Sequence, residues 1–79
     1  MKNFENLSMN EQINIQFQKV REILDNTKEF KNNYELITLN TDGCIFANKD
    51  YNSHFLLPRK NKKSLTSFDV EKIECIKTF

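Results

Sequence analysis

The chain has 79 residues, of which 38% are hydrophobic and 29% charged, so it has room for one domain (residues 1–79) and the balance of a folded globule. A net charge of +1 creates no bulk field to attract nucleic acid or a membrane surface. Because no run approaches 18 apolar residues and Met1–Asn6 lacks an apolar signal-peptide core, we expect no membrane contact and a cytoplasmic protein with reduced cysteines.

The first predicted element is a helix over about Met9–Lys31. Ser8 and Glu11 have the spacing of a capping box, in which Ser8 accepts from the Glu11 amide. Asn32-Asn33 suits the left-handed exit of a helix, and we expect fraying after Asp25. Apolar residues then recur at spacings of four, three and four and predict a buried stripe of Ile13, Phe17, Val20 and Leu24. Ile15 falls on the opposite side of this helix.

A β-hairpin is predicted next. Tyr34–Leu39 and Cys44–Ala47 are rich in strand formers, and Asp42-Gly43 between them favours a type I′ turn. With that two-residue loop, Leu39 faces Phe46. Both faces of this hairpin are partly apolar, so we expect that one helix does not cover all of the apolar surface.

The carboxyl-terminal third predicts a third strand and a second helix. His54–Leu57 reads as a strand that ends at Pro58 or lies at a sheet edge, since Pro cannot donate to a ladder. Thr66 resembles a helix N-cap and predicts a helix over Ser67–Lys77. Its apolar positions follow at spacing three: Val70, Ile73, Ile76 and Phe79. A strand over Phe68–Cys75 is the competing interpretation.

These elements predict an α+β fold in the order α-β-β-β-α, with helices packed on a three-stranded antiparallel meander. This element order, over roughly residues 9–79, resembles that of double-stranded RNA-binding domains, in which lysines at the start of the last helix contact phosphates. Two features differ: the Asp42-Gly43 turn is tight, and the basic run here precedes the helix cap. The resemblance is therefore one of order alone, and we transfer no functional residue from it.

Catalytic and metal-binding patterns are weak. The sequence has one histidine, so a Ser-His-Asp or Cys-His site has to use His54. Cys44, Cys75 and His54 do not have zinc-ligand spacing, and the single glycine, Gly43, forms no phosphate-binding loop. We therefore expect a protein that is not an enzyme and that carries no cofactor or metal.

The most distinctive segment is basic. It combines four positive residues with two aromatic ones just upstream, and these are the candidate binding residues: Arg59, Lys60, Lys62, Lys63, Tyr51 and Phe55. Basic groups beside aromatics are typical of phosphate and base recognition. The same lysines could instead be solvent-exposed charges that keep an edge strand from pairing with another molecule, or they could contact an acidic protein.

Two functions follow as hypotheses. The first is a small binding protein that modulates a larger host or cognate protein. Asn, Lys and Ile make up 28 of the 79 residues, which indicates an A/T-rich genome and fits an accessory or inhibitor protein of a phage or mobile element. The alternative is an RNA- or DNA-binding module that uses residues 59–63. A homodimer sealed by the Ile15 side of the first helix also stays open.

Overall fold

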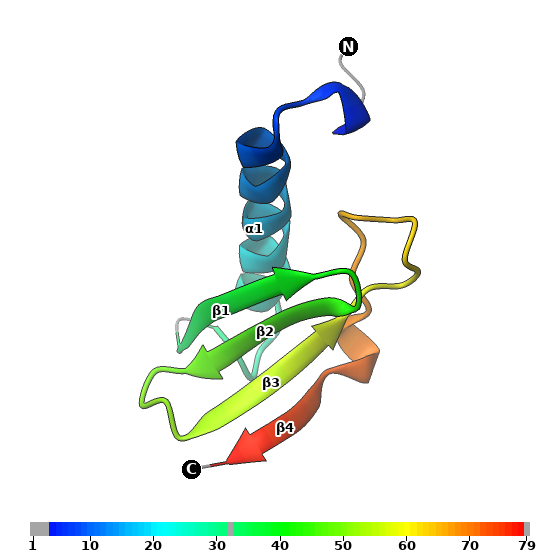
Figure 1. The fold of residues 1–79 in the computed structure, drawn as a ribbon. Helices are drawn as coiled ribbons and strands as arrows, with labels where there is room; N and C mark the ends of the chain where they lie inside the picture. Colours follow the sequence, from blue (N-terminus) through cyan, green and yellow to red (C-terminus); the bar gives the residue numbers. More distant parts are fainter. Residues whose placement is uncertain (1–3, 32, 79) are drawn as a thin grey trace.

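The computed structural model describes residues 4–31 and 33–78 and confirms an α+β fold (Figure 1). Its elements in chain order are a 3₁₀ turn η1 (Phe4–Asn6), helix α1 (Met9–Asn26), strands β1 (Tyr34–Asn40), β2 (Gly43–Asn48) and β3 (Ser53–Pro58), a 3₁₀ turn η2 (Val70–Lys72) and strand β4 (Glu74–Thr78). The strands form one antiparallel sheet in the order β1-β2-β3-β4. The predicted meander is thus correct in kind, but it has four strands rather than three.

Helix α1 begins where the capping box predicts. The Ser8 hydroxyl accepts from the Glu11 amide at 3.2 Å and donates to the Glu11 carboxylate at 3.0 Å. The helix ends at Asn26, and the Thr27 amide donates back to the Leu24 carbonyl at 3.1 Å. The prediction of a helix reaching Lys31 is therefore wrong after Asn26, where the chain forms turns; Asn32 lies outside the described residues.

The buried side of α1 is rotated from the predicted stripe. Val20 and Leu24 are fully buried as expected, but the third buried position is Gln16. Ile13 and Phe17 are only half-buried and lie outside the core cluster. The amino-terminal half of α1 rises beyond the sheet (Figure 1), and there Gln16 is buried by the loop after β3, whose Arg59 guanidinium donates to its side-chain oxygen.

The β1–β2 hairpin turns one residue earlier than predicted. Asn40 pairs with Gly43, so the loop is Thr41-Asp42, and Leu39 pairs with Cys44 rather than with Phe46. The Asn40 side-chain oxygen accepts from the amides of Asp42 and Gly43, at 2.9 and 3.1 Å, and so builds the turn. Gly43 becomes the first residue of β2 because its backbone passes close to that of β3.

The predicted carboxyl-terminal helix over Ser67–Lys77 is wrong. Asp69 caps only the single turn η2, by accepting from the Glu71 amide at 3.2 Å, and the chain then becomes strand β4. The competing strand over Phe68–Cys75 had the right type of element but lies too early in the chain. Phe79 lies outside the described residues. Without a final helix, the resemblance to double-stranded RNA-binding domains in element order also disappears.

Strand β4 changes the position of β3 in the sheet. Phe55 pairs with Cys75 and Leu56 with Glu74, so β3 lies in the interior of the sheet and not at an edge. Its end at Pro58 is as predicted. Pairing with β4 satisfies backbone groups of β3 that otherwise need water, and this long-range gain outweighs the local helix pattern.

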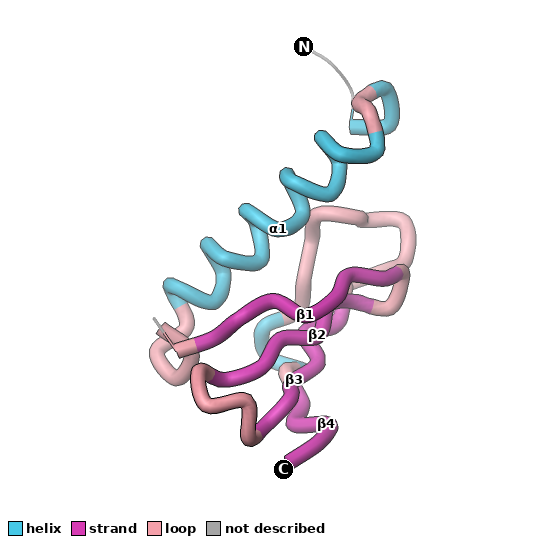
Figure 2. Tube along the Cα trace, turned by 60° about the vertical axis from the view of Figure 1, so that its left-hand side comes forward, coloured by secondary structure: helices cyan, strands magenta, loops and turns pink. Residues whose placement is uncertain are grey.

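The core lies between α1 and one face of the sheet (Figure 2). It consists of Val20 and Leu24 from the helix and Cys44, Phe46, Leu57 and Phe68 from the sheet side. Burying side chains of this kind contributes about 1.5–3 kcal/mol each. None of the described residues forms a helix long and apolar enough to cross a membrane.

Candidate functional site

A groove opens beside the carboxyl-terminal end of α1, on the same side of the sheet as the helix. It has a volume of about 550 Å³ and lies between the turn at residues 27–30 and the segment formed by η2 and β4. Its apolar lining comes from four separate parts of the chain: Phe30, Phe55, Val70, Ile73 and Cys75. The groove exists because α1 ends at Asn26, which leaves the part of the sheet near β4 without a helix over it.

Two phenylalanine rings form the floor of this groove. Phe30 and Phe55 meet edge to face with 5.2 Å between ring centres, and Phe55 stacks on the buried Phe46 at 5.4 Å. Both Phe30 and Phe55 also line a second hollow of about 410 Å³ next to the β2–β3 turn. Because core contacts fix these rings, the apolar floor is formed in advance of any ligand.

The rim of the groove is polar. Lys28, Glu29 and Glu71 line its edge together with Thr27. Val70 also lines the groove and keeps 44% of its surface exposed. An apolar floor within a polar rim is the arrangement found where a protein accepts an apolar side chain of a partner.

Arg59, the first of the predicted binding residues, is engaged inside the fold. Its guanidinium donates to the backbone oxygens of Asn40 (3.0 Å) and Leu65 and to the side-chain oxygen of Gln16. The same group lies over the Phe68 ring. Burial lowers the pKa of Arg59 from its usual value. These contacts join α1, β1 and the loop after β3, so the residue holds elements together.

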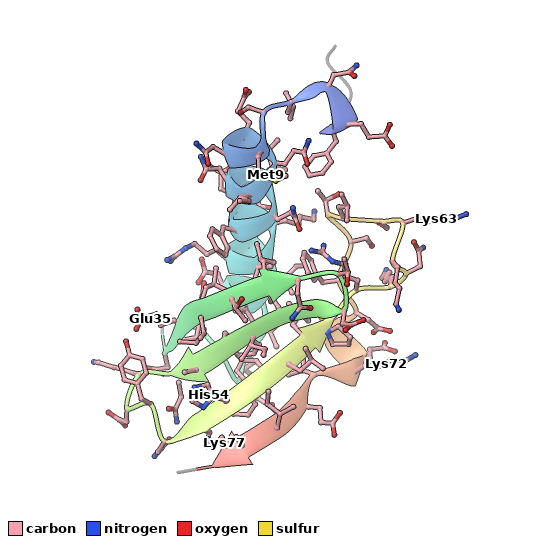
Figure 3. The ribbon with its side chains drawn as sticks, viewed as in Figure 1. Met9, Glu35, His54, Lys63, Lys72 and Lys77 are labelled. Atoms are coloured by element: carbon pink, nitrogen blue, oxygen red, sulfur yellow. The ribbon has the colours of Figure 1, made fainter. Side chains whose placement is uncertain are left out.

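The three predicted lysines lie on the exposed loop that follows. Lys62 reaches Asp42 at 3.7 Å, and both side chains are strongly exposed. Asn61 shapes the loop by accepting from the amides of Lys63 and Ser64, at 2.9 and 2.8 Å. The Lys63 side chain points away from the molecule (Figure 3). Lys60 is exposed as well.

The two predicted aromatic residues do not join this loop. Tyr51 lies in the β2–β3 turn, with a φ of 58°, at the opposite end of β3 from Arg59. A strand of six residues spans about 20 Å, so Tyr51 and the lysines lie far apart. Phe55 lies in the groove described above. The structure thus divides the six predicted residues among the groove, the junction at Arg59, the loop and the turn.

The sequence analysis named Phe55 as an aromatic residue beside the basic segment, and it named none of the other residues that line the groove. Phe30 follows the helix and does not belong to its predicted apolar stripe. Val70 and Ile73 were assigned to a helix that does not form.

Two titratable side chains away from the groove, Tyr34 and Cys44, have raised pKa values. Burial raises the pKa of the Cys44 thiol to about 12. Burial, together with a hydrogen bond to Asp25 at 2.8 Å, raises the pKa of Tyr34 to about 12. Within residues 4–31 and 33–78, no group of three or more His, Cys, Asp or Glu side chains gathers in a way that could hold a metal ion.

Comparison of the chain with protein-family models, with curated proteins and with solved structures finds no match.

Proposed function

We propose that this protein is a small, non-enzymatic binding protein that modulates a larger protein, and that the groove beside α1 receives an apolar side chain of that partner. The observation that supports the proposal is the aromatic floor of Phe30 and Phe55, two half-buried rings that line the groove together with the exposed Val70. A concave site with a preformed aromatic lining and a few polar groups at its edge is the usual form of a binding pocket.

The dimensions of the groove define the partner. A volume of about 550 Å³ accommodates one large apolar side chain and its neighbours, in the way a peptide segment anchors in a protein groove. Burial of one such anchor contributes about 1.5–3 kcal/mol, and the polar rim adds orientation. We therefore expect a segment with one or two apolar anchors, flanked by charged residues that face Lys28, Glu29 and Glu71.

Site-specific photo-crosslinking tests this proposal. A photoreactive phenylalanine analogue replaces Val70 in one variant and Ile15 in a matched control. Both positions are aliphatic and similarly exposed, at 44% and 38%, but Ile15 lies on α1 away from the groove. We expect one protein from the source cells to crosslink at position 70 and not at position 15, and Val70→Lys to abolish its capture while Ile15→Lys does not. Equal crosslinking at both positions, or capture unaffected by Val70→Lys, contradicts the proposal.

Nucleic-acid binding by the loop after β3 is a second candidate. The observation that favours it is the exposure of Lys60, Lys62 and Lys63 on one short loop. Replacing all three with Gln then reduces the dependence of log affinity on log salt by about 0.7–0.9 per lost phosphate contact. Titrations with labelled single- and double-stranded RNA and DNA measure this slope. Wild-type affinity no tighter than about 100 μM at low salt, the weak end of non-specific binding, eliminates this candidate.

A further inference from the structure

The face of the sheet that points away from α1 carries large apolar side chains. Helix α1 lies behind the sheet in Figure 1, and the opposite face has no element over it among the described residues. Ile37 and Ile76 are exposed by 47% and 44%, and Ile45 and Leu56 are half-buried. None of the four packs against the core cluster. We call these four residues the open face.

Each edge strand is irregular at its isoleucine. In β1 the pairing skips Ile37, between Leu36 and Thr38, and in β4 it skips Ile76, between Cys75 and Lys77. Leu36 packs on the core and Cys75 lines the groove, so both lie on the helix side of the sheet. The isoleucine that follows each of them therefore belongs to the open face.

Two rows of residues cross this face through all four strands. One row runs from Glu35 on β1 through Ala47 and His54 to Lys77 on β4, and its three ionisable members are labelled in Figure 3. The other row is formed by Thr38, Ile45, Leu56 and Glu74. In the first row a negative charge stands at one edge of the sheet and a positive charge at the other.

We propose that the open face binds a second copy of this chain, sheet against sheet, around a two-fold axis that runs parallel to the strands between β2 and β3. This axis places β1 of one copy opposite β4 of the other. Glu35 then faces Lys77 of the second copy. Ala47, in the same row, is fully buried within its own chain and adds no contact surface. In the other row Ile45 faces Leu56. Sheets that pack in this way align within about 30° and bury a layer about 10 Å thick.

The size of the face indicates a dimer of modest affinity. Four strands about 4.8 Å apart, with five or six residues each, give a contact of roughly 19 by 19 Å. This amounts to roughly 360 Å² per copy, or about 700 Å² for the pair, which is below the roughly 1,200 Å² of stable interfaces and in the range of weak, transient contacts. We therefore expect a weak dimer, with dissociation constants of roughly 0.1–1 mM, and a monomer–dimer equilibrium that responds to concentration.

The dimer leaves the groove beside α1 open in both copies, because the groove lies on the helix side of the sheet. The assembly therefore presents two grooves at once. A partner that is itself dimeric would bind both grooves with an avidity that neither groove gives alone. This inference is independent of the proposed function, because loss of the dimer does not remove the groove.

Charge reversal followed by sedimentation equilibrium tests the dimer. Glu35→Lys and Lys77→Glu each place like charges opposite one another across the axis, and we expect each to weaken association about tenfold at low salt. The double variant restores opposite charges and returns the dissociation constant to within about threefold of the wild-type value. Failure of the double variant to restore association overturns the proposal, as does a wild-type chain that is monomeric at about 1 mM.

Substitutions of the exposed isoleucines test the dimer independently of whether the charge variants fold. Ile37→Ser and Ile76→Ser change exposed side chains and should leave the circular dichroism spectrum unchanged while weakening the dimer about tenfold. Ile15→Ser, on α1, is the matched control and should associate like the wild type. If Ile15→Ser alone weakens the dimer, the interface lies on the helix and the sheet-to-sheet arrangement is wrong.

Discussion

The guanidinium of Arg59 lies over the ring of Phe68, with 5.0 Å between its Cζ atom and the ring centre, and the backbones of the same two residues form an isolated antiparallel bridge. The two ends of the loop over residues 60–67 therefore lie next to each other in space. Its lysines project from a base that is held by hydrogen bonds to Gln16, Asn40 and Leu65. A residue that the sequence assigned to ligand binding thus stabilises the fold.

Arg59→Lys is expected to lower the free energy of unfolding by about 1.5–3 kcal/mol. Lysine keeps the charge but lacks the planar group that donates in three directions, so the part-buried acceptors of Leu65 and Gln16 lose their partner. Urea denaturation measures the change. Lys63→Gln is the control, and it should stay within about 0.5 kcal/mol of the wild type. Equal midpoints for Arg59→Lys and wild type would show that the guanidinium contacts contribute little.

Gly43→Ala should be strongly destabilising, by more than about 2 kcal/mol. A Cβ atom at this position lies 2.3 Å from the Leu57 carbonyl oxygen and 2.8 Å from Pro58 Cα, and the φ of Gly43 is 154°. Both obstacles are backbone atoms of β3, so the strands have to separate. Asp42→Ala, one residue earlier, removes only an exposed pair with Lys62, and its thermal midpoint should remain near the wild-type value.

Leu24→Ala should cost about 2–5 kcal/mol, and Phe17→Ala clearly less. Leu24 is fully buried in the core cluster, whereas Phe17 is half-buried on the part of α1 that rises beyond the sheet. Chemical denaturation of the two variants compares them directly. The opposite ranking would indicate that the helix is rotated back toward the stripe predicted from the sequence.

Thiol reactivity should separate the two cysteines. Cys75 is exposed at the groove and should react with a thiol reagent in the native protein, whereas buried Cys44 should react only after unfolding. The Cys44 pKa is about 12 in the fold and near 9.0 when unfolded, so the unfolded chain releases this proton first as pH rises. Its contribution to stability is therefore complete below pH 9 and declines between pH 9 and pH 12. A Cys44→Ala variant should show a shallower decline over that window.

Local signals in the sequence predicted local structure well. The start of α1 depends on Ser8 and Glu11, which are three residues apart, and the predicted bond from the Glu11 amide to the Ser8 hydroxyl forms. The Glu11 carboxylate reaches back to Ser8 as well, but it accepts from the hydroxyl. The hairpin was located correctly, but its register was not, because Asn40 uses its side chain to close the turn. A side-chain acceptor of this kind competes with the backbone preference of Asp42-Gly43.

Long-range pairing limited the prediction of the rest. Val70, Ile73 and Ile76 fit a helical spacing, but residues 74–78 pair with β3, about twenty residues earlier in the chain. The groove was not predicted for the same reason. Phe55 was chosen as a binding residue, yet its neighbours Phe30 and Ile73 come from segments about twenty residues away in the chain. No window of local sequence contains that information.

The sheet order β1-β2-β3-β4 is also the order of the strands along the chain. Each strand pairs with the one made just before it, so no crossover connection has to close before pairing begins. The mean separation of contacting residues is therefore low for a protein with this much sheet, and topologies of that kind fold quickly. We expect refolding from urea in milliseconds, in a single phase by stopped-flow fluorescence of Tyr34 and Tyr51. A nascent chain of this design buries its aromatic residues soon after synthesis and spends little time as a substrate for proteases.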